Sequence, residues 1–136
     1  MRSVFILLLT IICSSCIDNK STTKLIDLDL LENHLPSLDN GEKIFNNSCL
    51  TCHLYGTGGA TILTDKNAWE QLFREKEMKT IFLNVLNGFT GNKGPMPEKG
   101  ACYNCTQEDL LDAISYILYI NRLTTNNQKF NFNQNK

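Results

Sequence analysis

The chain has 136 residues, of which 42% are apolar, and its 13 basic and 14 acidic residues leave a formal net charge of −1. This near-neutral charge provides no basic surface for nucleic acid, and the apolar content is too high for a fully disordered chain. No apolar run reaches the roughly 20 residues that a membrane-spanning helix needs. The 6 cysteines fall into close pairs, which suggests separate roles rather than one disulfide framework.

Residues 1–15 have the pattern of a secretory signal. Arg2 gives a positive start, residues 4–12 are almost entirely apolar, and small residues then precede Cys16. The end of this segment resembles a bacterial lipoprotein signal, which predicts export to the periplasm and lipid modification of Cys16. Ordinary cleavage before Cys16 without a lipid is the alternative. Both interpretations place the protein in an oxidising compartment, where disulfides persist.

Composition divides the rest of the chain into a linker, a domain and a tail. Residues 16–38 begin with a polar stretch that is typical of a tether, and the leucine-rich stretch at 25–31 is expected to pack against the domain that follows. Residues 124–136 are mostly Asn, Gln and Lys, with too little apolar surface to offset the entropy lost on ordering. We therefore expect one folded domain at 39–123 and a disordered polar tail.

Helical signals predominate within this domain and predict an all-α fold. Asp39 and Glu42 resemble a capping box, and the apolar spacing that opens at Thr106 and Asp109 is the most strongly amphipathic of the chain. Glycines and prolines recur through 88–105, so this stretch is predicted to be a long loop without regular structure. The helices are expected at 40–48, 65–74, 78–86 and 106–123.

Cys49, Cys52 and His53 form the C-x-x-C-H pattern of covalent haem attachment. The two thiols can add to the two vinyl groups on one edge of the porphyrin, while the next residue places an imidazole under the iron. A dithiol oxidoreductase motif would sit in an alternating strand and helix pattern, which this sequence lacks. A zinc site would need Cys102 and Cys105 as its second pair and would leave His53 unused. The pattern favours one covalently attached haem c, with His53 as the proximal iron ligand.

Met96 is the candidate for the second axial ligand. It lies between Pro95 and Pro97, which restrict the backbone so that the thioether points in one direction. Met78 has helical spacing and is interpreted as a packing or surface residue, and His34 as a surface or linker histidine. With both axial positions filled, the iron has no room for substrate or oxygen, so the site is suited to electron transfer.

Taken together, these motifs resemble the class I c-type cytochromes, and more specifically the short bacterial branch called cytochrome c-five. The resemblance covers about residues 40–123. Besides the C-x-x-C-H segment, it rests on Trp69, the Asn87-Gly88 turn, the run that begins with Met96-Pro97, and the Cys102-x-x-Cys105 pair. It implies a small all-α domain, with about four helices wrapped around one covalent haem.

The resemblance also implies roles for individual residues. Cys49 and Cys52 would attach the haem, and His53 and Met96 would ligate its iron. Cys102 and Cys105 would form a disulfide, and Gly41 and Phe45 would pack against Tyr116 where the first and last helices cross. Thr61 and Glu98 stand where the family commonly has prolines, and neither change is expected to abolish ligation. The side chains expected around the haem are Ile62, Leu63, Trp69, Phe82, Leu86 and Phe89.

These features predict a monohaem electron carrier rather than an enzyme. It would carry single electrons between redox proteins of a respiratory chain, such as membrane complexes or a terminal oxidase or reductase. A lipid on Cys16 would hold it at the membrane surface, where a tether raises its effective concentration near membrane partners. The alternative is a haem c subunit or ligand-binding module of a larger periplasmic enzyme complex, in which Met96 is displaceable.

Overall fold

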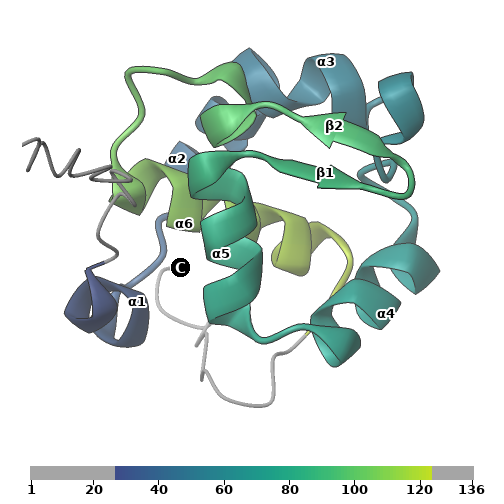
Figure 1. Cartoon of the computed structure of the whole chain (residues 1–136). Helices are drawn as coiled ribbons and strands as arrows, with labels where there is room; N and C mark the ends of the chain where they lie inside the picture. The colour runs from purple at the N-terminus through teal and green to yellow at the C-terminus, as the bar shows by residue number, and fades with distance from the viewer. Residues whose placement is uncertain (1–26, 124–136) are drawn as a thin grey trace, which may run out of the picture.

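The computed structural model describes residues 27–123. The expected signal at 1–15, the first part of the expected tether and the expected tail at 124–136 lie outside these residues. Figure 1 shows the helices packed against one another, with a short β-hairpin on one side. Between residues 27 and 123, no helix combines the length and the apolar composition needed to cross a membrane.

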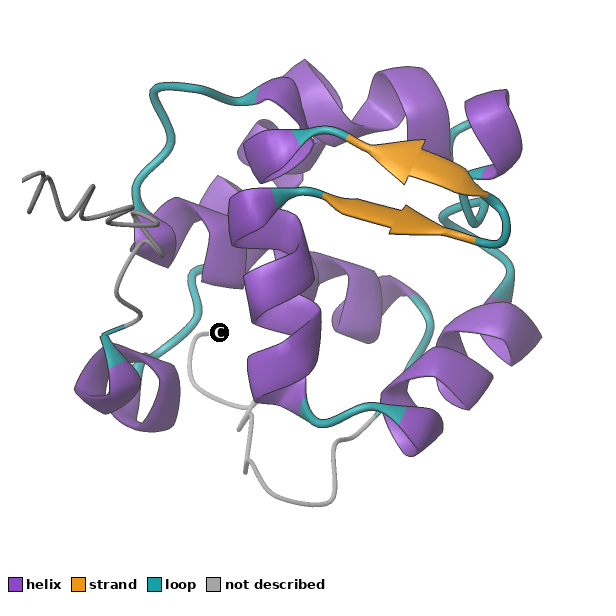
Figure 2. Ribbon diagram, in the orientation of Figure 1, coloured by secondary structure: helices purple, strands orange, loops and turns teal. Residues whose placement is uncertain are grey.

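Helices dominate the described structure, which confirms the predicted all-α class (Figure 2). The two strands found there form one antiparallel hairpin. In chain order the elements are α1 (Leu28–Asn33), α2 (Leu38–Ile44), a π-helical turn (Phe45–Cys49), α3 (Leu50–His53), a 3-10 turn (Thr57–Gly59), α4 (Lys66–Glu75), α5 (Met78–Asn87), β1 (Phe89–Gly91), β2 (Gly94–Met96), a 3-10 turn (Glu98–Ala101) and α6 (Gln107–Ile120).

The helix expected at 40–48 begins earlier and continues further than predicted. Its N-cap is Ser37, whose side chain accepts a hydrogen bond from the Asn40 amide at 3.3 Å. Helical backbone then continues through the π-helical turn into α3, so one helical run extends from Leu38 to His53. The C-x-x-C-H segment therefore occupies the C-terminal end of this run.

The other predicted helices lie close to their expected ranges, and two of them, α4 and α6, begin at side-chain caps. The Asp65 side chain accepts a hydrogen bond from the Ala68 amide at 3.1 Å and begins α4. Thr106 and Asp109 form a complete capping box at the start of α6, with hydrogen bonds of 2.9 and 3.2 Å. Such caps satisfy amides that have no partner within the helix.

The prediction that residues 88–105 lack regular structure is wrong. Strands β1 and β2 pair there with Phe89 opposite Met96 and Gly91 opposite Gly94, and the 3-10 turn at Glu98–Ala101 follows. Each strand has only 3 residues, which is too short to show an alternating pattern in the sequence. Met96 consequently lies on a strand whose position is set by its pairing with β1.

Helices α2 and α6 cross at Gly41. A Cβ atom on Gly41 would lie 2.2 Å from the Asp112 carbonyl oxygen and 3.1 Å from the Tyr116 Cβ, so only glycine permits this approach. One turn further along, the Phe45 ring is fully buried and its centroid lies 5.7 Å from that of Tyr116. This is the crossing that the resemblance implied.

Helix α6 supplies side chains to two hydrophobic clusters. The first joins α1, α5 and the Cys102 to Cys105 region, and its members are Leu31, Ile81, Phe82, Leu86, Cys105, Leu110, Leu111 and Ile114. The second adjoins the C-x-x-C-H segment and contains Phe45, Trp69, Ile117, Leu118 and Leu123. Because α6 belongs to both clusters, it connects the part of the fold that carries Cys49 with the part that carries the hairpin.

The described part of the expected tether packs against the domain. Leu31 of α1 is buried in the first cluster, as expected for the leucine-rich stretch. The interpretation of His34 as a surface or linker histidine is wrong, because its side chain is only 12% exposed and its Nε2 lies 2.7 Å from Asp112 Oδ1. The buried Asp112 carboxylate also accepts hydrogen bonds from the Ser37 amide and the Asn40 side chain, both at 2.9 Å. These contacts join the segment before α2 to α6.

Gly41→Ala tests the crossing of α2 and α6. Without the contact, alanine in a helix interior would stabilise the protein by about 0.5–1 kcal/mol. Because the added Cβ meets backbone atoms of α6, we expect the free energy of unfolding to fall instead, by about 1–3 kcal/mol. Urea unfolding followed by circular dichroism measures this, with Asn46→Ala at an exposed position as the control. A stabilised Gly41→Ala protein would contradict the close approach.

The capping box of α6 predicts a pH dependence. Hydrogen bonds lower the pKa of Asp109, first that from the Asn40 side chain and then that from the Thr106 amide. A carboxyl group with a lowered pKa stabilises the folded protein above its ordinary pKa of 3.8, and this stabilisation is lost as the pH falls through the lowered value.

We therefore expect Asp109→Asn to reduce the steepness with which the free energy of unfolding declines below pH 3.8. Unfolding by urea at a series of pH values measures the slope. Glu108→Gln removes the same charge from an exposed neighbour in the same turn and serves as the control. Equal slopes in the two variants would contradict this role of Asp109.

Candidate functional site

Two cysteines and a histidine lie at the end of the helical run that begins with α2. Cys49 closes the π-helical turn, and Cys52 and His53 follow in α3. Both thiols are unpaired and partly buried. Burial, and secondarily the Cys52 thiol, raise the pKa of Cys49 to about 11. A dithiol oxidoreductase requires a thiolate with a lowered pKa, so this environment argues against that alternative.

The His53 imidazole has a defined orientation and tautomer. Its Nδ1 lies 2.7 Å from the Thr61 carbonyl oxygen, and because a carbonyl only accepts, Nδ1 carries the hydrogen. The lone pair of the neutral ring is then on Nε2, the nitrogen available to a metal. Thr61 replaces a common proline, yet its own carbonyl makes the bond, so the orientation of His53 does not depend on a proline at this position.

Aromatic side chains and backbone contacts hold the His53 ring in place. Its centroid lies 6.3 Å from that of Phe45 and 5.6 Å from that of Trp69. The Trp69 indole donates a hydrogen bond to the Ile62 carbonyl at 2.8 Å, and the Leu63 amide donates to the His53 carbonyl at 2.7 Å. The loop after His53 therefore folds back onto α3 and α4.

The structure brings Met96 to the same region, although it lies far from the C-x-x-C-H segment in sequence. The meeting point is Gly100, in the 3-10 turn after β2, whose φ is 61°. A Cβ atom on Gly100 would lie 3.7 Å from Cys49 Sγ and 3.8 Å from the Met96 methyl carbon. Sequence reasoning did not assign Gly100, and the only signal for it was a glycine in the run after Met96.

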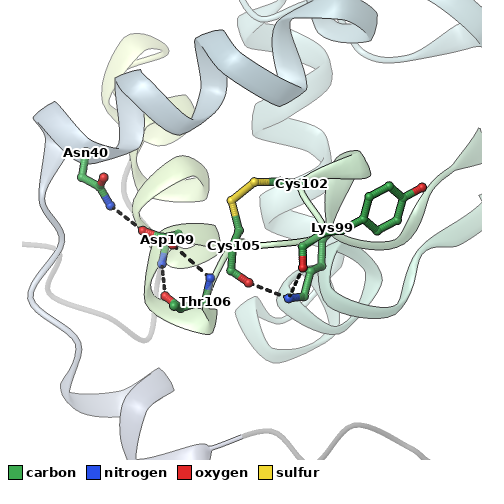
Figure 3. The surroundings of a disulfide bond; sticks show 7 residues. Asn40, Lys99, Cys102, Cys105, Thr106 and Asp109 are labelled. Atoms are coloured by element: carbon green, nitrogen blue, oxygen red, sulfur yellow. Dashed lines mark hydrogen bonds between the residues drawn. A yellow bond between two sulfur atoms is a disulfide. The ribbon is translucent and has the colours of Figure 1, made fainter.

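A disulfide joins Cys102 and Cys105 just before α6 (Figure 3). Beside it, the Lys99 ammonium donates hydrogen bonds to the carbonyl oxygens of Tyr103, at 3.3 Å, and Cys105, at 2.5 Å. The Cys102 to Cys105 disulfide and the hydrogen bonds of Lys99 thus restrict the backbone between Met96 and α6. The disulfide also occupies both sulfur atoms that a four-cysteine zinc site would require from this pair.

The six side chains expected around the haem occupy three different environments. Trp69 is buried in the second cluster, and Leu63 packs against that cluster. Phe82 and Leu86 are fully buried in the first cluster. Ile62 and Phe89 are each 41% exposed. The Lys76 ammonium lies over the Phe89 ring, 4.6 Å from its centroid.

The described residues match the chemistry of covalently bound haem c. Cys49 and Cys52 offer two unpaired thiols one helical turn apart, His53 offers Nε2, and Met96 offers a thioether from a different part of the fold. Thioether, imidazole and methionine groups are the attachments and axial ligands of c-type haem. This donor set supports one-electron chemistry.

Comparison with known proteins also indicates a cytochrome with covalently bound haem. Residues 36–117 match a family described as "Cytochrome C oxidase, cbb3-type, subunit III". The chain is 36% identical to cytochrome c6 of Pyropia tenera over 84 residues, which cover 60% of this chain and 89% of the relative. It is 33% identical over 78 residues to cytochrome c-555 of Chlorobaculum tepidum, which cover 57% of this chain and 71% of that relative.

The cytochrome c-555 of Chlorobaculum thiosulfatiphilum is also 33% identical over 78 residues, which cover 90% of its length. The family match extends over more than half of the chain, and it includes the C-x-x-C-H segment, Met96 and most of α6. The relatives carry the names of electron-transferring cytochromes. The chain therefore belongs to the class I c-type cytochromes, and it is a monohaem electron carrier with a covalently attached haem c.

Proposed function

We propose that Cys49 and Cys52 attach the haem and that His53 and Met96 are its axial ligands, so that the protein transfers electrons without binding a substrate at iron. The observation that carries this proposal is the position of Met96 near Cys49: a Cβ atom on Gly100 would lie 3.8 Å from the Met96 methyl carbon and 3.7 Å from Cys49 Sγ. Haem c supplies the one-electron centre, whose potential methionine ligation and burial raise.

The chain's own groups hold the two ligands and keep water away. The Thr61 carbonyl fixes the His53 ring and increases its basicity as a ligand, which favours a stable bond to iron. On the other side, the hairpin and the disulfide restrict the strand that carries Met96. The side chains of Ile62, Leu63, Trp69, Phe82, Leu86 and Phe89 would surround the porphyrin.

The finer assignment is to the cytochrome c-five branch, with the Cys102 to Cys105 disulfide as its supporting feature. The protein would be exported to the periplasm and anchored by a lipid on Cys16. Its partners would then be redox proteins of a respiratory chain that are reachable from the membrane surface. The near-neutral charge of the chain favours docking that depends only weakly on salt.

Met96→Ala tests axial ligation. We expect the variant to retain covalent haem, since Cys49 and Cys52 are intact, but to lose the weak methionine-to-iron charge-transfer absorption of the ferric form. Absorption spectra of the purified ferric protein measure this, and Met78→Leu is the matched control at the other methionine of the domain. Persistence of the band in Met96→Ala would show that another residue ligates the iron.

Carbon monoxide distinguishes the electron carrier from a ligand-binding haem module. If Met96 remains on the iron, the spectrum of the wild-type ferrous protein at neutral pH should change little on mixing with carbon monoxide. The Met96→Ala protein should bind it rapidly, because its sixth coordination position is open. Rapid binding by the wild type would favour the alternative, a haem subunit with a displaceable methionine.

The mass of the protein purified from its native membrane tests the predicted N-terminus. We expect a chain that begins at Cys16, with one haem and added acyl groups. In Cys16→Ala, which removes the thiol that the lipid requires, we expect no acyl mass and no membrane association. A wild-type mass that includes haem but no acyl chain would contradict the lipid anchor while leaving the assignment of the haem ligands intact.

A further inference from the structure

The loop after His53 and the hairpin that leads to Met96 meet through glycine backbone. In the 3-10 turn at Thr57–Gly59, a Cβ atom on Gly59 would lie 1.8 Å from the Lys93 carbonyl oxygen. On the facing strand, a Cβ on Gly94 would lie 2.2 Å from the Gly58 carbonyl oxygen. Real Cβ atoms do not approach other atoms so closely, so each side of this contact requires glycine.

The backbone conformation imposes the same requirement independently. Gly59 has a φ of 84° and Gly94 a φ of 131°, values that residues with a side chain rarely adopt. Glycine also costs more conformational entropy on folding than other residues do. A contact that needs glycine on both sides for two separate reasons is a specific feature of the fold rather than a chance proximity of loops.

The contact lies close to both proposed axial ligands. Gly94 is on β2, the strand that carries Met96, and Gly59 is two residues before Thr61, whose carbonyl orients His53. The other end of the hairpin is also held, because a Cβ on Gly88 would lie 3.0 Å from the Met96 carbonyl oxygen. Moving the hairpin turn away from the 3-10 turn would therefore tilt the strand that carries Met96.

We infer that Gly59 and Gly94 are positioning residues. The close approach of Gly59 to the Lys93 carbonyl and of Gly94 to the Gly58 carbonyl, here called the glycine clasp, holds the Met96 strand against the loop that orients His53 and so limits access of external ligands to the iron. This inference rests on the proposed axial ligation by Met96. The clasp acts through the strand and touches neither the iron nor the sulfur of Met96. It controls how often the methionine leaves the iron rather than the chemistry of the bond.

Adjacent glycines provide a matched pair of variants. Gly58 and Gly59 both have positive φ, at 64° and 84°, so alanine strains the backbone at either position. A Cβ on Gly58 meets no atom within 4 Å, whereas a Cβ on Gly59 collides with the Lys93 carbonyl. Comparing Gly59→Ala with Gly58→Ala therefore separates loss of the clasp from backbone strain.

The test measures the rate at which carbon monoxide binds the ferrous holoprotein and imidazole binds the ferric holoprotein, followed by their absorption changes. We expect Gly59→Ala to speed both reactions by about tenfold or more over the wild type, and Gly58→Ala to change them by about twofold at most. Both variants should retain covalent haem and the methionine-to-iron absorption at equilibrium. Equal rates in the two variants would overturn the inference.

Hydrogen exchange of the wild-type ferrous protein, followed by NMR, provides a second test that needs no substitution. If the clasp opens as a unit, the amides of Gly59 and Ala60 should exchange with the same opening free energy as the paired amides of β1 and β2. Opening free energies that clearly differ between the turn and the hairpin would overturn the inference, even if Gly59→Ala failed to fold. Rapid carbon monoxide binding by the wild type would instead contradict the proposed ligation by Met96.

Discussion

The close approach of α2 to α6 at Gly41 is the contact on which the rest of the structure depends. Because no side chain separates the two backbones at Gly41, the helical run that begins with α2 crosses α6 at close range. That path places Phe45 in the core beside Tyr116 and puts Cys49, Cys52 and His53 at the far end of the run. The position of the haem-binding segment is thus decided by a backbone contact two turns before it.

Polar side chains also stabilise the packing of α2 against α6. The buried Asp112 carboxylate accepts hydrogen bonds from the Ser37 amide and the Asn40 side chain and pairs with His34. A buried carboxylate is tolerated only when its oxygens have partners, so these groups depend on one another. Residues 28–37, which include α1, are therefore part of the folded unit.

A feature could be predicted from the sequence where the residues that form it lie within a few positions of each other. The capping box at Thr106 and Asp109 and the C-x-x-C-H pattern involve residues within four positions of each other, so the start of α6 and the presence of haem c could be predicted. The capping box expected at Asp39 and Glu42 was wrong, because the N-cap of α2 is Ser37. The hairpin, the burial of His34 and the role of Gly100 could not be predicted. The strands of the hairpin have only three residues each, which is too short to show a period. The burial of His34 and the role of Gly100 depend on Asp112 and Cys49, which lie far away along the chain.

The amino-acid sequence by itself determined the chemistry of this protein: two thiols and an imidazole at the spacing of a porphyrin edge and its iron, and a methionine between two prolines. Tertiary structure decided how these groups meet. The Thr61 carbonyl selects the nitrogen of His53 that can bind a metal, and Gly100 allows Met96 to lie beside Cys49. Glycine is informative at these positions only when the opposing backbone is known, because a missing side chain matters only where another atom occupies its place.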